Sequence, residues 1–281
     1  MWIFLVILHT VVKGIKSVIK KLACQNISVI EFLFVLTVLS LFIMLPTCGE
    51  AIEIEPKYYG LIAIKAGLLL AHEILSVVAI KKLALGTYGV LDLSRILFTT
   101  ILSVTILKET LGVQYVIGLS LICAGLLVVI IFNKDHNENV NSNKVLLIVI
   151  VFFVSLINSL MDLYDKILMK DVTSVQVQFW HLVYLLIAYT VYILFTKSKI
   201  QLSLFKDKYM WIMAILSVIS NQALLSAYKI PQSKVTIMTI TGEMGCIISI
   251  LAGKYIFKEK NTLIKLVSAG IVISGIVVCV V

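Results

Sequence analysis

Charged residues, proline and arginine are all scarce in this sequence. Asp, Glu, Lys and Arg make up 14% of its 281 residues, against about 25% in a typical soluble domain. Only three prolines occur and the glycines are scattered, which excludes collagen-like and low-complexity chains. Apolar residues make up 60% of the chain, and the mean hydropathy is +1.08. One water-soluble core cannot bury this excess, so we expect a membrane protein.

Motifs for several kinds of chemistry are also absent. The five cysteines stand apart, without a C-x-x-C pair, so neither a disulfide framework nor a zinc site is predicted. There is no G-x-x-x-x-G-K-[ST] loop, no complete H-E-x-x-H and no G-x-S-x-G elbow. We therefore expect no enzyme activity, no catalytic residue, no cofactor and no metal. The N-terminus lacks the basic region and cleavage site of a removable signal peptide.

The positive charge of the chain fits a membrane better than a nucleic acid. The formal net charge is +9, which in a soluble protein would suggest a nucleic-acid partner. Here the lysines flank apolar runs, where they meet lipid headgroups and water, so we expect no nucleic-acid partner. The 24 basic residues include a single arginine, Arg95, which lies inside an apolar run.

The apolar runs have the length of transmembrane helices. A helix needs about 20 apolar residues to cross the hydrocarbon core, and continuously apolar runs of this length exclude the alternating strands of a β-barrel. The short connections make neighbouring spans antiparallel. We predict an all-α membrane protein with ten spans near 2–19, 29–47, 59–80, 89–107, 111–132, 145–168, 174–196, 209–228, 233–256 and 261–281.

The ten spans divide into two similar halves. A polar linker at 133–144 has five spans on each side, at 1–132 and 145–281. Glu109 precedes Gly125 in the first half as Glu259 precedes Gly275 in the second. The two glutamates are 150 residues apart, and so are the two glycines. An odd number of spans per half means that the second half enters the membrane from the opposite side. Such inverted repeats are typical of alternating access, with the substrate bound near the midplane.

The ends of the halves resemble the EamA-type branch of the drug/metabolite transporter superfamily, over nearly the whole chain. The resemblance rests on T-I-L-K-E ending at Glu109 with the small-residue run from Gly118 to Gly125, and on Y-I-F-K-E ending at Glu259 with Gly270 and Gly275. It implies a transporter of small molecules in a bacterial plasma membrane, with both termini in the cytoplasm. The sequence departs from the family in having no proline early in the fourth span, while Pro231 only introduces the ninth.

Polar residues inside the predicted spans are the candidates for a binding site. A charge in the bilayer core costs about 2.5–3.5 kcal/mol on insertion scales, so it faces a cavity or a partner. The predicted substrate-binding residues are His72, Glu73, Asp92, Arg95, Asn158, Asp162, Asn221, Gln222 and Glu243. Further polar residues within the spans are Lys13, Lys16, Asp165, Lys166 and His181.

Arg95 is the strongest of these candidates. Its planar guanidinium suits an anionic group of the substrate; the alternative is a structural ion pair with Asp92 or Glu243. Glu73 or Glu243 is the candidate for a proton carrier, because burial raises the pKa of a carboxyl group. For His72 and His181 we favour hydrogen-bonded contacts between helices.

We therefore expect an exporter or exchanger of a small polar or amphipathic metabolite such as an amino acid, with protons as a candidate coupling ion. The alternatives are a membrane subunit or sensor that does not transport, and an intramembrane enzyme acting on a lipid-linked substrate. Orientation stays open, because lysines gather in the loops after the first, third, seventh and ninth spans. By the positive-inside rule this places both termini outside, against the family topology.

Overall fold

The structure, a computed structural model, describes residues 2–24, 27–106, 112–132, 143–197, 200–259 and 261–280. This part of the chain is helical and contains no strand. Two short 3₁₀ segments cover Leu45–Thr47 and Leu202–Lys206. The α-helices are α1 (Trp2–Ala23), α2 (Val29–Met44), α3 (Cys48–Ile52), α4 (Lys57–Lys82), α5 (Leu85–Asp92), α6 (Ser94–Ile106), α7 (Val113–Phe132), α8 (Asn143–Leu168), α9 (Ser174–Thr196), α10 (Lys208–Lys229), α11 (Val235–Glu243), α12 (Cys246–Tyr255) and α13 (Thr262–Val280).

Nine helical stretches in the described part of the chain are long and apolar enough to cross a membrane. They correspond to the first nine predicted spans. The tenth predicted span corresponds to α13, whose described apolar stretch, Thr262–Gly275, is shorter than a full span. The all-helical, multi-pass character predicted from the sequence is confirmed.

Side chains at the helix ends explain where several helices begin. The hydroxyl of Ser28 accepts a hydrogen bond from the Glu31 N–H at the start of α2. Thr173 and Gln176 form a reciprocal capping box at the start of α9. Asp207 accepts from the Tyr209 N–H at the start of α10. Each cap satisfies a backbone N–H that has no partner within its helix, so helix starts are fixed by local sequence.

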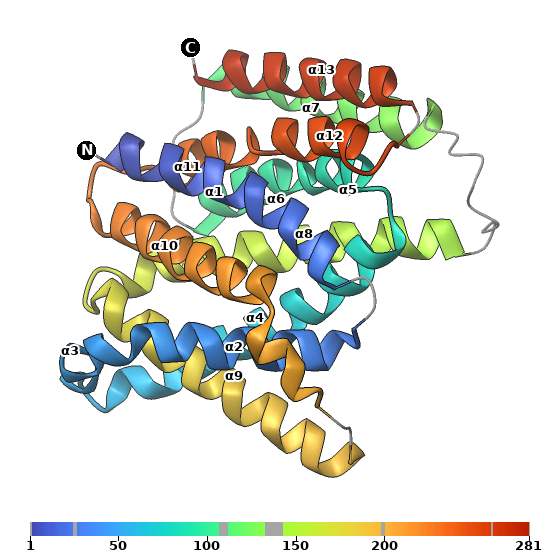
Figure 1. The fold of residues 1–281 in the computed structure, drawn as a ribbon. Coiled ribbons are helices and arrows are strands. Elements are labelled where there is room, and N and C mark those ends of the chain that lie inside the picture. Colours follow the sequence, from blue (N-terminus) through green and yellow to red (C-terminus); the bar gives the residue numbers. More distant parts are fainter. Residues whose placement is uncertain are drawn as a thin grey trace.

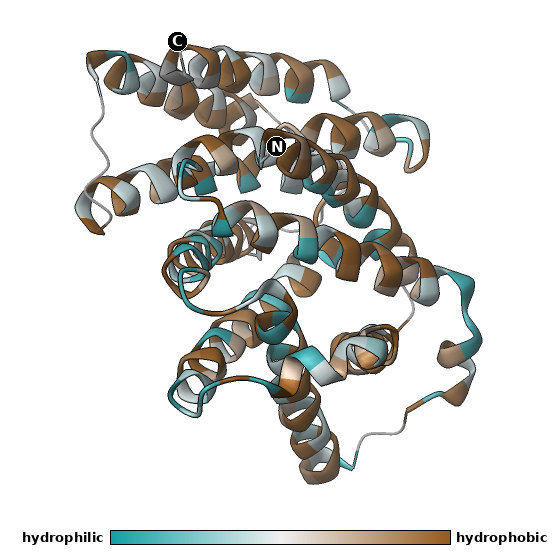
Figure 2. Cartoon of the chain, turned by 90° about the vertical axis from the view of Figure 1, so that its left-hand side faces the viewer, coloured by the Kyte–Doolittle hydropathy of each residue, from teal (hydrophilic) through white to brown (hydrophobic). Residues whose placement is uncertain are grey.

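The outer surface is apolar. Large hydrophobic side chains such as Phe4 on α1, Val113 on α7 and Phe195 on α9 are at least 70% exposed. Figure 2 shows hydrophobic residues along most of the helices, with hydrophilic residues in patches between helices and at their ends. A monomeric soluble protein rarely exposes apolar surface on this scale, so these faces contact lipid.

The helices are arranged in neighbouring groups, as Figure 1 shows. Helices α7 and α13 lie side by side at one end and pack extensively on each other. Next to them lie α5, α6, α11 and α12, with contacts of α5 on α12 and of α6 on α11. Helices α2, α4, α9 and α10 form the other end, and α1 and α8 lie between, on α10 and on α4 respectively.

Two spans are interrupted near the middle of the molecule. Between α5 and α6, the Leu93 N–H donates to the Val90 carbonyl, three residues back. Between α11 and α12, the N–H groups of Met244 and Gly245 make the same kind of bond to Thr241 and Gly242. Neither interruption contains a proline. Mid-helix turns of this 3₁₀ type often mark functional sites, and these two lie beside the charged residues described next.

Candidate functional site

A cavity of about 220 Å³ lies among α1, α2, α4, α8, α9 and α10 and reaches α5 and α6. Four lysines, one arginine and four carboxylates line it, together with several hydroxyl, amide and imidazole groups. Its remaining wall is apolar, with leucine and methionine side chains. Drug-sized ligands occupy about 300–1,000 Å³, so this cavity suits a small metabolite.

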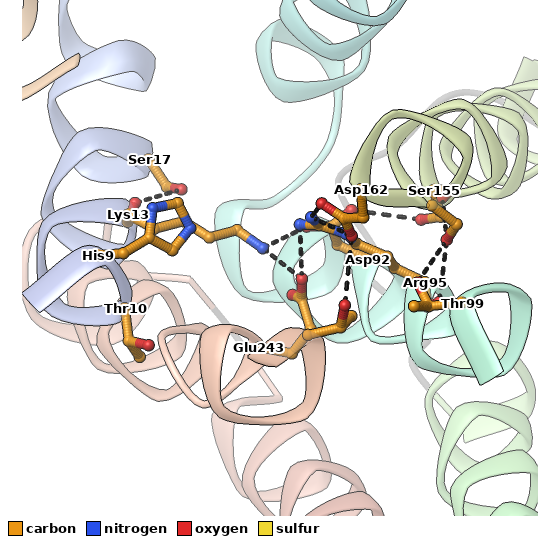
Figure 3. Close-up of polar contacts among 12 residues, drawn as sticks. His9, Thr10, Lys13, Ser17, Asp92, Arg95, Thr99, Ser155, Asp162 and Glu243 are labelled. Atoms are coloured by element: carbon orange, nitrogen blue, oxygen red, sulfur yellow. Dashed lines mark hydrogen bonds and ion pairs between the residues drawn. The ribbon is translucent and has the colours of Figure 1, made fainter. Parts of the chain in front are cut away.

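Arg95, at the start of α6, is the centre of a buried group of charges. Its guanidinium donates to Asp162 on α8 at 2.5 Å and to Glu243 on α11 at 3.0 Å. A second pair of atoms, Nε of Arg95 and Oδ2 of Asp162, lies at 3.0 Å, so the contact is bidentate. Thr239 also donates to Asp162. Figure 3 shows this guanidinium between the two carboxylates.

Lys13 on α1 completes this group from the opposite side. Its ammonium lies 2.6 Å from Glu243 and 3.4 Å from Asp92. Asp92 also accepts a 3.3 Å hydrogen bond from Ser155 on α8. The Arg95 cluster, defined as Lys13, Asp92, Arg95, Asp162 and Glu243, thus joins α1, α5, α6, α8 and α11 (Figure 3).

Stability alone does not account for a cluster of this kind. The side chains of Asp162, Arg95 and Glu243 are at most 7% exposed. Removing charges from water costs several kcal/mol per ion, so a well-packed apolar group is often as stable as a buried ion pair. Ionisable residues inside a membrane protein therefore indicate a functional site.

Two further ion pairs lie on the cavity wall. Lys20 on α1 donates to Glu73 on α4 at 2.8 Å and to Ser76 at 3.1 Å. Lys65 on α4 lies 2.5 Å from Asp165 on α8. Of the predicted site residues, Glu73 therefore belongs to the first of these pairs and not to the Arg95 cluster.

The remaining predicted site residues divide into two groups. His72, Asn158 and Asn221 line the cavity. Gln222 does not line it, and its amide donates to the Ser174 carbonyl on α9 at 3.4 Å. Most of the predicted substrate-binding residues thus meet around one cavity, whereas their role in binding stays a prediction.

Three further polar residues have partners in the structure, and the contact between helices expected for His181 is not among them. His181 lines the cavity and its ring N–H donates to the Val177 carbonyl, within its own helix. Lys166 donates to the Tyr228 and Ile230 carbonyls and so caps the end of α10. Asp165 takes Lys65 as its partner.

Several cavity residues were missed in the sequence. Lys65 interrupts an apolar span and could have been found by the criterion used for Lys13. His9, whose ring nitrogen lies 2.9 Å from the Ser220 hydroxyl, could also have been found in this way. Tyr88 and Tyr189 gave no signal, because a tyrosine in an apolar run resembles any core aromatic residue.

Comparisons with known proteins agree with the fold. Residues 1–131 match the model of the EamA-like transporter family. No curated protein matches the sequence. Twenty-eight chains of solved structures match. One of these, a crystal structure, covers 96% of this chain and 95% of its own length, with a TM-score of 0.69 at 14% identity. The resemblance seen in the sequence is confirmed for residues 1–131, which match the EamA-like transporter family, and the apolar helices of the described residues are those of a multi-pass membrane protein.

Proposed function

We propose that this chain is a secondary transporter that exports or exchanges a small polar or amphipathic metabolite, such as an amino acid, across a bacterial plasma membrane. Alternating access takes place between two inverted five-helix halves, 1–132 and 145–281, joined by the linker 133–144. The observation that carries the proposal is the small cavity whose charged groups come from α1, α4, α5 and α6 of the first half and from α8 of the second.

The pairing of the helices supports two related halves. If α1 begins the first half and α8 begins the second, then the contact of α1 with α10 is equivalent to the contact of α8 with α4. In the same way, α2 on α10 is equivalent to α9 on α4. The contacts of α7 with α13 and of α2 with α9 each join a helix to its own equivalent, and the contact of α5 with α12 is equivalent to that of α11 with α6. This reciprocity is what a two-fold axis in the membrane plane requires.

The α7–α13 contact repeats this reciprocity between individual residues. A Cβ on Gly125 would lie 2.9 Å from the Ser268 carbonyl, and a Cβ on Gly275 would lie 2.6 Å from the Gly118 carbonyl. Ser268 follows Gly118 by the same 150 residues that separate Gly275 from Gly125. Glu109, the expected equivalent of Glu259, lies outside the described residues.

Reconstitution of the full chain into liposomes tests the proposal. We expect time-dependent flux of at least one member of a panel of radiolabelled amino acids and related metabolites, faster when unlabelled solute is present on the opposite side. Counterflow of this kind requires a carrier and is absent for a sensor or subunit. A chemically altered solute recovered from the liposomes would favour the enzyme alternative. Correctly folded protein without any flux would refute the transporter.

We extend the proposal to protons as the coupling ion. Glu73 lines the cavity and Glu243 lies behind it, between Lys13 and Arg95, so either carboxyl group can exchange its cation partner for a proton. An imposed pH gradient should drive uphill accumulation of substrate, and a protonophore should abolish it. Substrate accumulation that does not depend on the pH gradient would exclude proton coupling, and the proposal of substrate exchange would remain.

A further inference from the structure

The charges around the cavity are balanced as a whole but separated in space. With histidines counted as neutral, the Arg95 cluster has two cations and three carboxylates. Lys16 and Lys20 with Glu73 have two cations and one carboxylate. The pair of Lys65 and Asp165 has no net charge. One region of the cavity therefore has an excess negative charge, and another an excess positive charge.

Asp92 has the weakest cation contact in the negative region. Asp162 is held by the bidentate guanidinium of Arg95, and Glu243 by the 2.6 Å contact with Lys13. Asp92 has only the 3.4 Å contact with the same lysine and a 3.3 Å hydrogen bond from Ser155. It lines the cavity, which Glu243 does not. Asp92 is thus the carboxylate open to a cationic group.

Lys16 is the corresponding cation in the positive region. It lines the cavity one helical turn before Lys20, whose ammonium is already occupied by Glu73. Among the described residues, Lys16 has no carboxylate within ion-pair distance and makes no hydrogen bond.

An unpartnered hydroxyl nearby also indicates a bound group. Tyr189 on α9 lines the cavity and is 1% exposed, yet its hydroxyl has no hydrogen-bond partner in the described chain. The buried Nδ1 of His72 likewise lacks a hydrogen-bond partner there. A buried polar group without a partner is costly, so a ligand atom at this position would be favoured.

We infer that the substrate is zwitterionic, with its anionic group bound by Lys16 and the Tyr189 hydroxyl and its cationic group bound by Asp92. This inference rests on the proposed transport function and specifies its substrate class. A zwitterion neutralises both excess charges at once, whereas an amine or an acid neutralises only one and leaves the other buried.

Matched ligands test the inference directly. The probes are the twenty amino acids, titrated calorimetrically into the purified full chain; each binder is then compared with its decarboxylated amine and its deaminated acid. For leucine, these are 3-methylbutylamine and 4-methylpentanoate. We expect each single-charge analogue to bind about 10- to 100-fold more weakly, the effect of losing one charge-assisted hydrogen bond. Equal binding of an analogue would overturn the inference.

Two variants test which residue binds each charged end of the substrate. Lys16→Gln should weaken zwitterion binding and reduce the preference for the zwitterion over the decarboxylated amine. Asp92→Asn should instead reduce the preference over the deaminated acid. A merely structural role would not produce this crossed pattern. Lys16→Arg should retain the preference, and the exposed Lys170→Gln should bind like the wild type.

Failure of the inference is distinct from failure of the proposed function. If no amino acid binds while the liposomes transport other metabolites, the inference of a zwitterionic substrate is wrong and the proposed transport function is retained. An unchanged preference in a folded Lys16→Gln protein would also refute the assignment of Lys16. If nothing is transported, the proposed function itself fails.

Discussion

Two carboxylate clusters in this molecule use similar side chains for different purposes. In the Arg95 cluster, the carboxylates take their contacts mainly from side chains, and four of the five residues line the cavity. In the second, the Glu259 cluster, one carboxylate after α12 accepts hydrogen bonds from the Leu85 and Gly86 N–H groups at the start of α5. Lys21 on α1 and Lys265 on α13 lie 3.3 and 3.1 Å from it.

The difference between the clusters lies in what completes them. Backbone N–H groups at a helix start are fixed and favour an anion, so the Glu259 cluster is complete and joins the ends of four helices. It does not line the cavity. The Arg95 cluster has more carboxylates than cations and borders the cavity, so its partners can be exchanged. The Glu259 cluster is structural, and the Arg95 cluster is suited to binding.

Loss of Arg95 should have the largest effect. Arg95→Met removes the only guanidinium and leaves Asp162 and Glu243 buried without their partner. We expect a loss of about 3–5 kcal/mol in folding stability, the usual cost of breaking a buried pair, together with loss of transport. Unfolding in detergent and flux in liposomes measure the two effects.

A double variant separates stability from transport. Arg95→Met combined with Asp162→Asn removes the unpaired charge along with its partner. It should recover part of the lost stability while transport stays absent, because the exchangeable charges are gone. Wild-type flux in a folded double variant would contradict the functional role of the cluster.

Loss of Glu259 should have a smaller and different effect. Glu259→Gln keeps the size of the side chain but weakens four hydrogen bonds or ion pairs. We expect destabilisation of about 1–3 kcal/mol and an unchanged apparent affinity for substrate in the molecules that remain folded. Thermal unfolding and the substrate dependence of the flux test this. A selective change in substrate affinity would show that the Glu259 cluster belongs to the binding site.

Acidification should weaken the same cluster. Burial tends to raise the pKa of Glu259, but Lys265, the Gly86 N–H and Lys21 together hold it below its ordinary value. A carboxyl group with a lowered pKa in the folded state adds stability above its unfolded pKa, about 4.3. That stability is lost as the pH falls through the lowered value. The stability difference between wild type and Glu259→Gln should therefore disappear in acid, and a constant difference would contradict this.

The sequence predicted the first nine spans and most of the charged cavity residues, because both depend on local properties. Continuous apolar length predicts a transmembrane helix, and a charge within such a run predicts a polar cavity. Asp162 and Glu243 were recognised by this criterion and lie together at Arg95. The charge-within-a-span criterion also applies to Lys65, although it was not used there.

The pairing of charges could not be predicted, because it depends on packing. The partners considered for Arg95 were Asp92 and Glu243; the arginine donates to Glu243 on α11 and, without any signal in the sequence, to Asp162 on α8. The interruptions at Leu93 and Met244 were also missed, since no proline marks them. Lysines counted toward orientation were likewise ambiguous: Lys20 faces the cavity and Lys21 holds Glu259, so neither is a free loop charge.

The α7–α13 contact provides an uncharged reference for both clusters, with the smallest expected effect. Gly275→Ala would place a methyl group 2.6 Å from the Gly118 carbonyl, whereas a Cβ on Gly270, in the same helix, meets no atom within 4 Å. Overpacking typically costs 1–3 kcal/mol, and about 1 kcal/mol is regained from helix propensity. We expect Gly275→Ala to lose about 1 kcal/mol and Gly270→Ala to gain up to about 1 kcal/mol from helix propensity alone, as measured by thermal unfolding. Neither change alters a charge, so substrate preference should stay at the wild-type value in both. Equal stability of the two variants would mean that α7 and α13 do not pack through this glycine.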